Sequence, residues 1–332
     1  MQKNCCLSEA EIMNKKRKEI IANNEISEIY TLNLGGYNQK VLVEGKKKEL
    51  PIVIFLHGGP GTPIPFSVGC RGLFPQFTDK FIMVYWDQLG CGINNYVIDE
   101  QFTIEKFVDM TKDLICEIKR MFPENSIYIF ATSWGSILSA KVLEKITDTI
   151  KGVVVCGQII KEVFFNEEVY EALQKSKLPN SKLSTIKSAD IDKITPKELQ
   201  LVSSSIRKYT SGYENKNGEA TPMGAVIWGL LTSPDYKFKD FKAVMMNGYL
   251  NNVSLWKEIL KIDLSSTLKN IKIPYTIIQG DTDIVASTKT VQAVAEESTY
   301  LKCKVVNNSG HYPNKEVMDM VYEELIAQIY GQ

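Results

Sequence analysis

The sequence of 332 residues has neither a charge bias nor a long apolar run. Lysine plus arginine and aspartate plus glutamate number 39 each, so the composition does not suggest nucleic acid or an anionic membrane as a partner. No stretch approaches the roughly 20 apolar residues of a transmembrane helix, and the N-terminus lacks the apolar core of a signal peptide. We therefore expect a soluble, cytoplasmic protein with no membrane span.

Cysteine and histidine are also sparse. The seven cysteines are scattered and odd in number, which argues against a disulfide framework and against a zinc cluster. The only histidines are His57 and His311. Two carboxylates, Asp281 and Asp283, follow an apolar run, but no histidine, cysteine or further acid accompanies them. We therefore expect no metal and no cofactor.

Apolar residues make up 44% of the chain, enough for one large core, with or without an insertion. A β-hairpin is predicted at residues 26–43, and residues 103–122 have the spacing of an amphipathic helix. Short apolar runs predict buried strands at residues 51–56, 81–86, 127–130, 152–156, 273–279 and 302–306. Strands that alternate with helices predict an α/β protein with a mostly parallel sheet and a site at the carboxyl ends of its strands.

The pattern changes between residues 158 and 262, where strand-like runs disappear. Helices are expected at 162–175, 195–209, 221–231 and 243–260, separated by a polar connector at 177–192 and a turn-rich patch at 211–219. We interpret the segment as a helical cap inserted after the sixth strand; longer helices within one layer are the alternative. The expected organisation is a peripheral N-terminal helix at 1–25, a core of 26–157 and 263–332, and a cap at 158–262.

Residues 128–139, YIFATSWGSILS, read as a strand, a sharp turn and a helix. A serine at the apex of such a turn has its hydroxyl pushed clear of the sheet. Small residues are needed on either side because the strand and the helix cross closely there, and Ala131 and Gly135 supply them. The N–H of Trp134, at the start of the helix, would favour negative charge on a substrate oxygen. Ser133 is therefore the candidate nucleophile, although ordinary strand-to-helix turns can share this pattern.

Residues 57–61, HGGPG, follow the strand at 51–56 and form a loop whose backbone can approach a ligand closely. Such a loop can aim the N–H of Gly59, with Gly58 as the alternative, at the oxygen addressed by Trp134, and two converging donors make an oxyanion hole. A plain glycine-proline turn is the other interpretation. His57 is expected to be structural within this loop, which leaves His311 as the candidate general base, oriented by one of the two aspartates.

These motifs resemble the proline iminopeptidase branch of the α/β-hydrolase fold. HGGPG, a WDQ-x-G-x-G turn at 86–92 and the small-x-Ser-Trp-Gly turn stand in the family's order. The resemblance implies Asp283 as the acid, through the Gly-x-x-Asp pattern at 280–283, with Asp281 as the rival. The order Ser133, Asp283, His311 is that of α/β-hydrolase triads. The second motif departs from the family's usual DQRG-x-G-x-S at Leu89 and Asn94, and it is expected to be structural.

The expected activity is serine hydrolysis through an acyl-enzyme, and the resemblance implies an aminopeptidase that acts on short peptides, proline especially. In that family, cap glutamates bind the substrate's ammonium group. Here Trp228-Gly229 stands where a Trp-Glu pair is usual, so no motif places these glutamates. The available acids are Glu167, Glu168, Glu171, Glu214, Glu219 and Asp235, and the candidates for substrate binding are Trp228, Glu214 and Glu219. The alternatives are an esterase or amidase for a small uncharged acyl substrate, and a ligand-binding protein without turnover. The sequence does not predict the oligomeric state.

Overall fold

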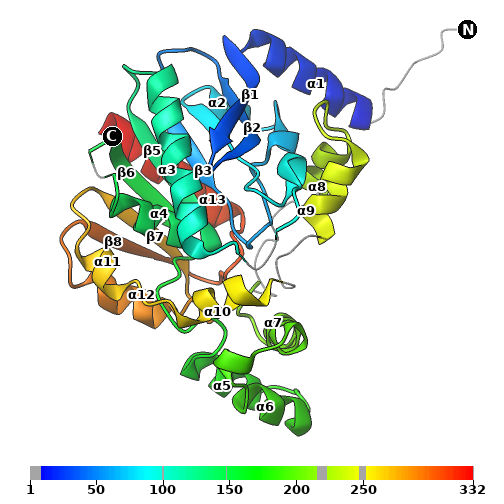
Figure 1. Ribbon diagram of the computed structural model, residues 1–332, viewed down its shortest axis with the longest axis vertical. Helices are drawn as coiled ribbons and strands as arrows, with labels where there is room; N and C mark the ends of the chain where they lie inside the picture. Colours follow the sequence, from blue (N-terminus) through cyan, green and yellow to red (C-terminus); the bar gives the residue numbers. More distant parts are fainter. Residues whose placement is uncertain (1–8, 99–100, 147, 215–222, 247–251, 332) are drawn as a thin grey trace, which may run out of the picture.

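The computed structural model describes residues 9–98, 101–146, 148–214, 223–246 and 252–331. Eight strands form one sheet in the order β1-β2-β4-β3-β5-β6-β7-β8 (Figure 1). Their bounds are β1 (Ile26–Leu34), β2 (Tyr37–Gly45), β3 (Ile52–Leu56), β4 (Ile82–Tyr85), β5 (Ile127–Thr132), β6 (Ile150–Cys156), β7 (Tyr275–Gly280) and β8 (Leu301–Val306). β1 and β2 pair antiparallel, β2 pairs antiparallel with β4, and the other neighbours are parallel. The predicted mostly parallel sheet is confirmed.

Helices cover both faces of this sheet. α3 (Ile104–Met121), α4 (Trp134–Leu143) and α12 (Thr288–Ala295) pack on one face, and α2 (Pro75–Thr78) and α13 (Lys315–Tyr330) pack on the other (Figure 1). Along β3, Ile54 belongs to the first hydrophobic core and Phe55 to the second. Because both faces are buried, the central strands are largely apolar, and β3 is apolar at every position, which is why continuous runs predicted them.

The amphipathic helix α3 supports the turn that carries Ser133. Its first turn is capped by Thr103, whose side chain accepts a hydrogen bond from the Lys106 N–H. Its apolar face is buried, and the ring of Phe107 meets Trp134 edge to face with centroids 5.6 Å apart. Packing of α3 on α4 therefore fixes the helix that begins directly after Ser133.

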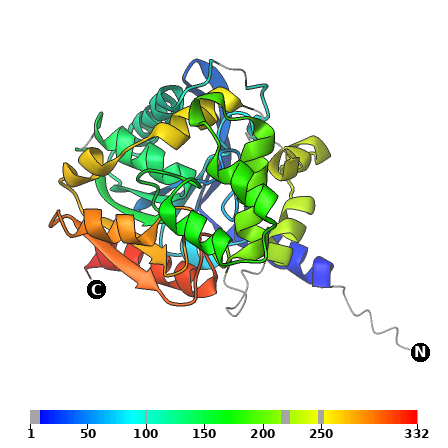
Figure 2. The same ribbon diagram turned by 90° about the horizontal axis from the view of Figure 1, so that it is seen from below.

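Helices occupy the chain between β6 and β7: α5 (Glu167–Gln174), α6 (Asn180–Lys187), α7 (Pro196–Tyr209), α8 (Met223–Leu231), α9 (Phe238–Met246), α10 (Val253–Lys261) and α11 (Ser265–Lys269). α5, α6 and α7 lie beyond the lower edge of the sheet in Figure 1, and they lie in front of the sheet in Figure 2. α8 and α9 lie instead beside the N-terminal helix α1 (Glu9–Asn23). The helical segment thus forms two groups.

Several sequence-based boundaries in this region are wrong. The polar connector predicted at 177–192 contains α6, which buries Ile186 and packs on α5 and α7. The helix expected from residue 162 begins only at 167, because Glu162 and Phe164 have positive φ values of 54° and 66°. The helix expected at 243–260 is two helices, and residues 247–251 lie outside the described residues.

The helix expected at the N-terminus is α1, which docks on the rest of the molecule through one arginine. Arg17 is only 3% exposed, and its guanidinium donates hydrogen bonds to the carbonyl oxygens of Gly69, Arg71 and Gly229. Gly229 lies in α8, so this side chain links α1 to that helix. Burial lowers the pKa of Arg17, and three carbonyl acceptors stabilise its charge.

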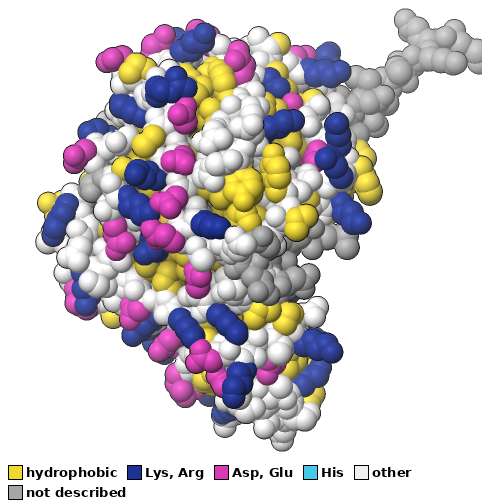
Figure 3. Space-filling model, viewed as in Figure 1, with side chains coloured by type: hydrophobic (Ala, Val, Ile, Leu, Met, Phe, Trp, Pro, Cys, Tyr) yellow, Lys and Arg dark blue, Asp and Glu magenta, His cyan; other side chains and the backbone are white. Residues whose placement is uncertain are grey.

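The surface carries charges of both signs. On the face shown in Figure 3, basic and acidic side chains are interspersed, with apolar side chains between them. None of the described helices is both long enough and apolar enough to span a lipid bilayer.

Candidate active site

Ser133 sits at the sharp turn between β5 and α4. Its backbone has φ 48° and ψ −117°, a conformation rare for a residue with a side chain, and its N–H donates to the Cys156 carbonyl at 3.0 Å. Two residues later, a Cβ on Gly135 would lie 2.0 Å from the carbonyl oxygen of Leu56. Only glycine therefore fits where α4 crosses β3, which is the close crossing that the sequence pattern predicted.

The three side chains predicted to act together meet at the carboxyl ends of the strands. The Ser133 Oγ lies 2.7 Å from the His311 Nε2, and the His311 Nδ1 lies 2.7 Å from the Asp283 Oδ2. Asp283 and His311 are 1% and 6% exposed. An N–H at Nδ1 would donate a hydrogen bond to the Asp283 carboxylate. Nε2 then carries no proton and can accept the proton of the serine hydroxyl.

Asp283 is held by donors on both of its carboxylate oxygens. The Oδ1 accepts hydrogen bonds from the backbone N–H groups of Val285 and Ala286, at 2.9 and 3.0 Å. The Oδ2 accepts from the Gln279 Nε2 at 2.9 Å as well as from His311. This set of donors fixes the carboxylate with one oxygen facing the imidazole. Gln279 was not predicted; its one sequence signal is a polar residue within a buried apolar strand.

The rival aspartate has another structural role. Asp281 is exposed, and its Oδ1 accepts a hydrogen bond from the Ser309 N–H at 3.1 Å. Its own N–H donates to the Val306 carbonyl. Asp281 thus supports the loop that leads to His311, whereas Asp283 contacts the imidazole itself.

The HGGPG loop lies against Ser133. A Cβ on Gly58 would lie 3.2 Å from the Ser133 Cβ, so the backbone comes as close to the serine as the absence of a side chain allows. Gly59 has φ +114°, and a Cβ there would lie 2.6 Å from the Gly61 nitrogen. Gly58 therefore stands beside the start of α4, where the N–H of Trp134 lies, and Gly59 follows it in the loop.

His57 lies within this loop and braces it. Its Nδ1 is 2.8 Å from the Gly58 carbonyl, and its Nε2 accepts a hydrogen bond from the Gln88 N–H at 3.0 Å. The Gln88 side chain donates to the His57 carbonyl and accepts from the Trp134 indole N–H. Gln88, from the WDQ motif, thus ties the HGGPG loop to the residue after Ser133. We had expected that motif to be structural, without foreseeing this link.

Burial lowers the pKa of His57 to about 4. Because a depressed histidine pKa means that the unfolded chain binds the proton more tightly, stability should be lost as pH falls from about 6.5 towards 4. A shift of this size corresponds to a loss of about 2 to 3 kcal/mol between pH 7.5 and 4.5. We expect His57→Gln to remove that part of the pH dependence, as measured by urea unfolding at both pH values. Equal losses in the two proteins would contradict the buried neutral imidazole.

Two of the three residues proposed for substrate binding, Trp228 and Glu214, lie within the described residues, and they come from different segments. Trp228 is 45% exposed on α8, and Glu219 lies outside the described residues. Glu214 is exposed but lies near the histidine loop: burial raises the pKa of Tyr312, and the charge of Glu214 adds to that rise. Among the residues that the structure describes, no three histidine, cysteine or acidic side chains group as metal ligands.

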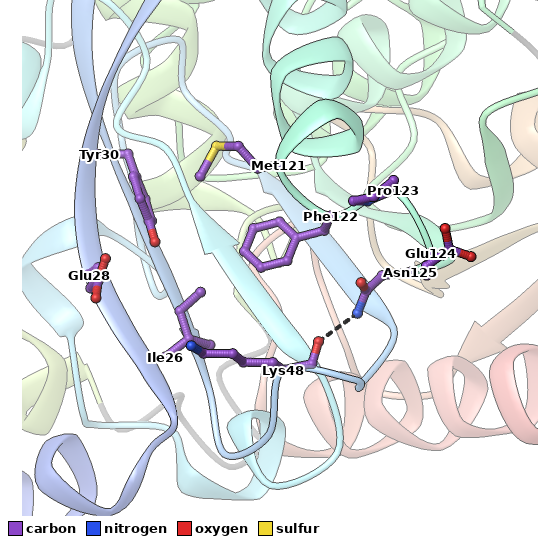
Figure 4. Close-up of a pocket in the computed structure, with 9 residues that line it drawn as sticks. All are labelled: Ile26, Glu28, Tyr30, Lys48, Met121, Phe122, Pro123, Glu124 and Asn125. Carbon is purple, nitrogen blue, oxygen red and sulfur yellow. Dashed lines mark hydrogen bonds between the residues drawn. The ribbon is translucent and has the colours of Figure 1, made fainter.

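A surface hollow occurs at the opposite edge of the sheet, between β1 and the turn after α3 (Figure 4). It is closed at one side by the hydrogen bond from the Asn125 side chain to the Lys48 carbonyl, at 2.8 Å. Asn125 lies two residues before β5, whereas Ser133 follows that strand. The hollow is therefore at the amino ends of the parallel strands, away from Ser133, and carries none of the predicted site residues. Its lining comprises Ile26, Glu28, Tyr30, Lys48, Met121, Phe122, Pro123, Glu124 and Asn125.

Comparisons with known proteins find relatives that are named as peptidases. The chain is 23% identical over 296 residues to "Probable aminopeptidase YbaC" of Bacillus subtilis, covering 86% of this chain and 91% of that protein. It is 23% identical over 262 residues to a proline iminopeptidase of Heyndrickxia coagulans, covering 79% and 84%. The crystal structure of a proline iminopeptidase from Mycobacterium smegmatis superposes with a TM-score of 0.60, at 18% identity, over 92% of this chain and 99% of that one.

A family model described as the alpha/beta hydrolase fold matches residues 51–316, from the start of β3 into α13. That match spans the serine turn, the helical segment and the histidine loop. Together with the sheet order and the crossing at Ser133, it shows that the chain belongs to the α/β-hydrolase fold family.

Proposed function

We propose that the protein is a serine hydrolase that releases N-terminal residues from short peptides, proline especially, through an acyl-enzyme on Ser133. The observation that carries the proposal is the continuous chain of two 2.7 Å contacts from Ser133 through His311 to Asp283. The relatives named as aminopeptidases support the choice of substrate.

In the first step, the Ser133 oxygen attacks the substrate carbonyl carbon while the His311 Nε2 takes the hydroxyl proton. Asp283 accepts a hydrogen bond from the His311 Nδ1–H. It thereby holds the imidazole in the required tautomer and stabilises the imidazolium. The negative charge moves to the carbonyl oxygen, where the N–H of Trp134 and that of Gly59, or alternatively Gly58, would bind it. One such donor typically contributes about 2.7 to 4 kcal/mol to the stability of the transition state.

In the second step, His311 donates its proton to the leaving amine as the carbon–nitrogen bond breaks. The acyl group of the N-terminal residue is then held on Ser133 as an ester. Water attacks this ester with His311 as the base, which releases the carboxylic acid and restores the serine hydroxyl.

We further propose that residues 158–262 act as a cap on a core made of residues 26–157 and 263–332. α5, α6 and α7 lie beyond the sheet edge at which β5, β6 and β7 end, so they flank the route to Ser133. A cap at this edge would limit access to short substrates, as an exopeptidase requires, and would exclude water from the reacting bond.

An esterase or amidase for small uncharged acyl groups is the second candidate. The observation that favours it is the sequence Trp228-Gly229, where the resembling family has a Trp-Glu pair, on a helix whose tryptophan is 45% exposed. A site that binds a free ammonium group needs a paired acid, since a buried unpaired charge is costly. Binding without turnover fits less well, because the serine, histidine and aspartate are already in hydrogen-bond contact.

A substrate panel separates these candidates. We expect prolyl- and alanyl-arylamides to be hydrolysed with a kcat/KM about 100-fold above their N-acetylated forms, because blocking the amine leaves the binding acid unpaired. The measurement is arylamine release at pH 7.5, with p-nitrophenyl acetate as a reference for acyl transfer. Equal turnover of free and blocked substrates would instead identify an esterase or amidase.

A further inference from the structure

The turn after α7 crosses the loop that carries His311. The N–H of His311 donates to the Gly212 carbonyl at 2.8 Å, and the N–H of Tyr312 donates to the Tyr213 carbonyl at 2.9 Å. These two backbone hydrogen bonds join residues about a hundred positions apart in the chain. We call residues 211–213 the strap. Their position against His311 was not foreseen, since the sequence only indicated turns there.

The strap also reaches the loop that carries Asp283. The Thr282 hydroxyl lies 3.0 Å from the Ser211 carbonyl and 2.8 Å from the Ser309 carbonyl. Gly310 is packed so closely that a Cβ on it would lie 2.6 Å from the Tyr213 backbone. The strap is therefore in direct contact with both the loop that carries Asp283 and the loop that carries His311.

The Tyr213 ring packs on the imidazole itself. The rings of Tyr213 and His311 meet edge to face, with centroids 6.0 Å apart and planes at 80°. Tyr213 is only 5% exposed, and its hydroxyl lies 2.9 Å from the Ser203 Oγ in α7. A Cβ on Gly157 would lie 3.1 Å from the His311 Cε1, so that backbone also limits how the imidazole can move.

Arg207, in the last turn of α7, connects the strap to the histidine loop from the solvent side. Its guanidinium lies 5.2 Å from the centroid of the Tyr213 ring and 5.3 Å from that of Tyr312. It also donates a hydrogen bond to the Tyr312 hydroxyl at 2.6 Å. Arg207 is exposed, and the Tyr213 and Tyr312 rings still contact each other, tilted by 32° with centroids 5.0 Å apart, so the guanidinium can be removed without opening the core.

We propose that the strap positions the His311 imidazole against Ser133, with Tyr213 as a positioning residue that acts through the histidine. The inference rests on the proposed function, in which His311 is the base. Proton transfer from serine needs the two atoms at hydrogen-bond distance, and a misplacement of about 1 Å can cost about 100-fold in rate. His311 lies in a loop without regular structure, so contacts from α7 and its turn would supply the rigidity that a strand or helix supplies elsewhere.

The test compares Tyr213→Ala, Tyr213→Phe and Arg207→Met on p-nitrophenyl acetate and on an alanyl arylamide. We expect Tyr213→Ala to lower kcat by roughly 30- to 100-fold on both substrates, with KM changed less than about threefold, since the defect lies in proton transfer. Tyr213→Phe keeps the ring and should restore kcat to within about threefold of the native value. Arg207→Met should lower kcat by about three- to tenfold. Tyr209→Ala removes a ring from the same helix and should leave kcat unchanged.

An unchanged kcat in Tyr213→Ala would overturn the inference. So would a variant in which only KM changes, or in which only the alanyl arylamide is hydrolysed more slowly, because either result would indicate that Tyr213 contacts the substrate. Should Tyr213→Ala fail to fold by circular dichroism, Arg207→Met decides in the same way: a lower kcat on both substrates supports the strap, and a native kcat overturns it. Ser133→Ala in the same panel keeps the two proposals apart. Activity that depends on Ser133 but not on the strap contradicts only this inference, whereas activity that survives Ser133→Ala contradicts the proposed function.

Discussion

Replacing Ser133 by alanine is expected to lower kcat by about 10⁶-fold, the typical cost of removing the nucleophile of a serine triad. The hydroxyl is the only group at this turn within 2.7 Å of the His311 Nε2, so its loss leaves the imidazole with no proton to take from the protein. The fold should survive, because the Ser133 backbone conformation does not depend on its side chain. Turnover of an alanyl arylamide and labelling by a fluorophosphonate probe measure the effect.

Ser136 provides the matched control, three residues further along the chain in the first turn of α4. Its Oγ accepts a hydrogen bond from the Ile159 N–H at 2.9 Å, and it is fully buried. Ser136→Ala should lose about 1 kcal/mol of stability while keeping turnover and labelling. Labelling that persists in Ser133→Ala, or that disappears in Ser136→Ala at a temperature where that variant is folded, would contradict the assignment of the nucleophile.

The features that the sequence predicted well are those fixed by local chemistry. Strands buried on both faces are largely apolar, so β3 and β5 could be recognised without knowledge of their neighbours. The turn at Ser133 needs small flanking residues because strand and helix cross there, and Gly135 records that constraint in the sequence. With only two histidines, and His57 assigned to the first loop, the base followed by elimination.

The features that it missed depend on contacts between distant segments. Residue type alone did not separate Asp281 from Asp283, and the preference for Asp283 rested on the resemblance. In the structure, Asp283 is distinguished by its contact with His311 and by donors from Gln279 and two backbone amides. The strap at 211–213 carries turn residues that say nothing about a partner a hundred positions away. α6 has a weak apolar pattern because it buries a single residue fully, Ile186. Such contacts follow from the packed fold and leave little trace in local patterning.

Asp283→Asn is expected to lower kcat by about 10⁴-fold, through the histidine tautomer rather than through lost structure. The N–H groups of Val285 and Ala286 both donate to the Oδ1, so an asparagine there must place its amide oxygen in the same position. Its NH₂ group then replaces the Oδ2 and faces the His311 Nδ1. The imidazole must accept that hydrogen bond, which puts its own proton on Nε2, and Nε2 can no longer take the proton of Ser133.

Asp281→Asn is the control, since its carboxylate accepts a single hydrogen bond, from the Ser309 N–H, and an amide oxygen can replace it. We expect its kcat to stay within about threefold of the native value. Asp283→Asn should also lose about 1 to 3 kcal/mol of stability, because its NH₂ group would face the Gln279 Nε2, which is itself a donor. Activity is therefore compared at a temperature at which circular dichroism shows both variants folded, which separates the chemical effect from unfolding. A large loss in Asp281→Asn with a native rate in Asp283→Asn would transfer the role of the acid to Asp281. The two aspartates lie two residues apart, but only Asp283 contacts the His311 Nδ1, at 2.7 Å. Comparing the two variants therefore tests whether the base needs this direct contact or only a negative charge nearby.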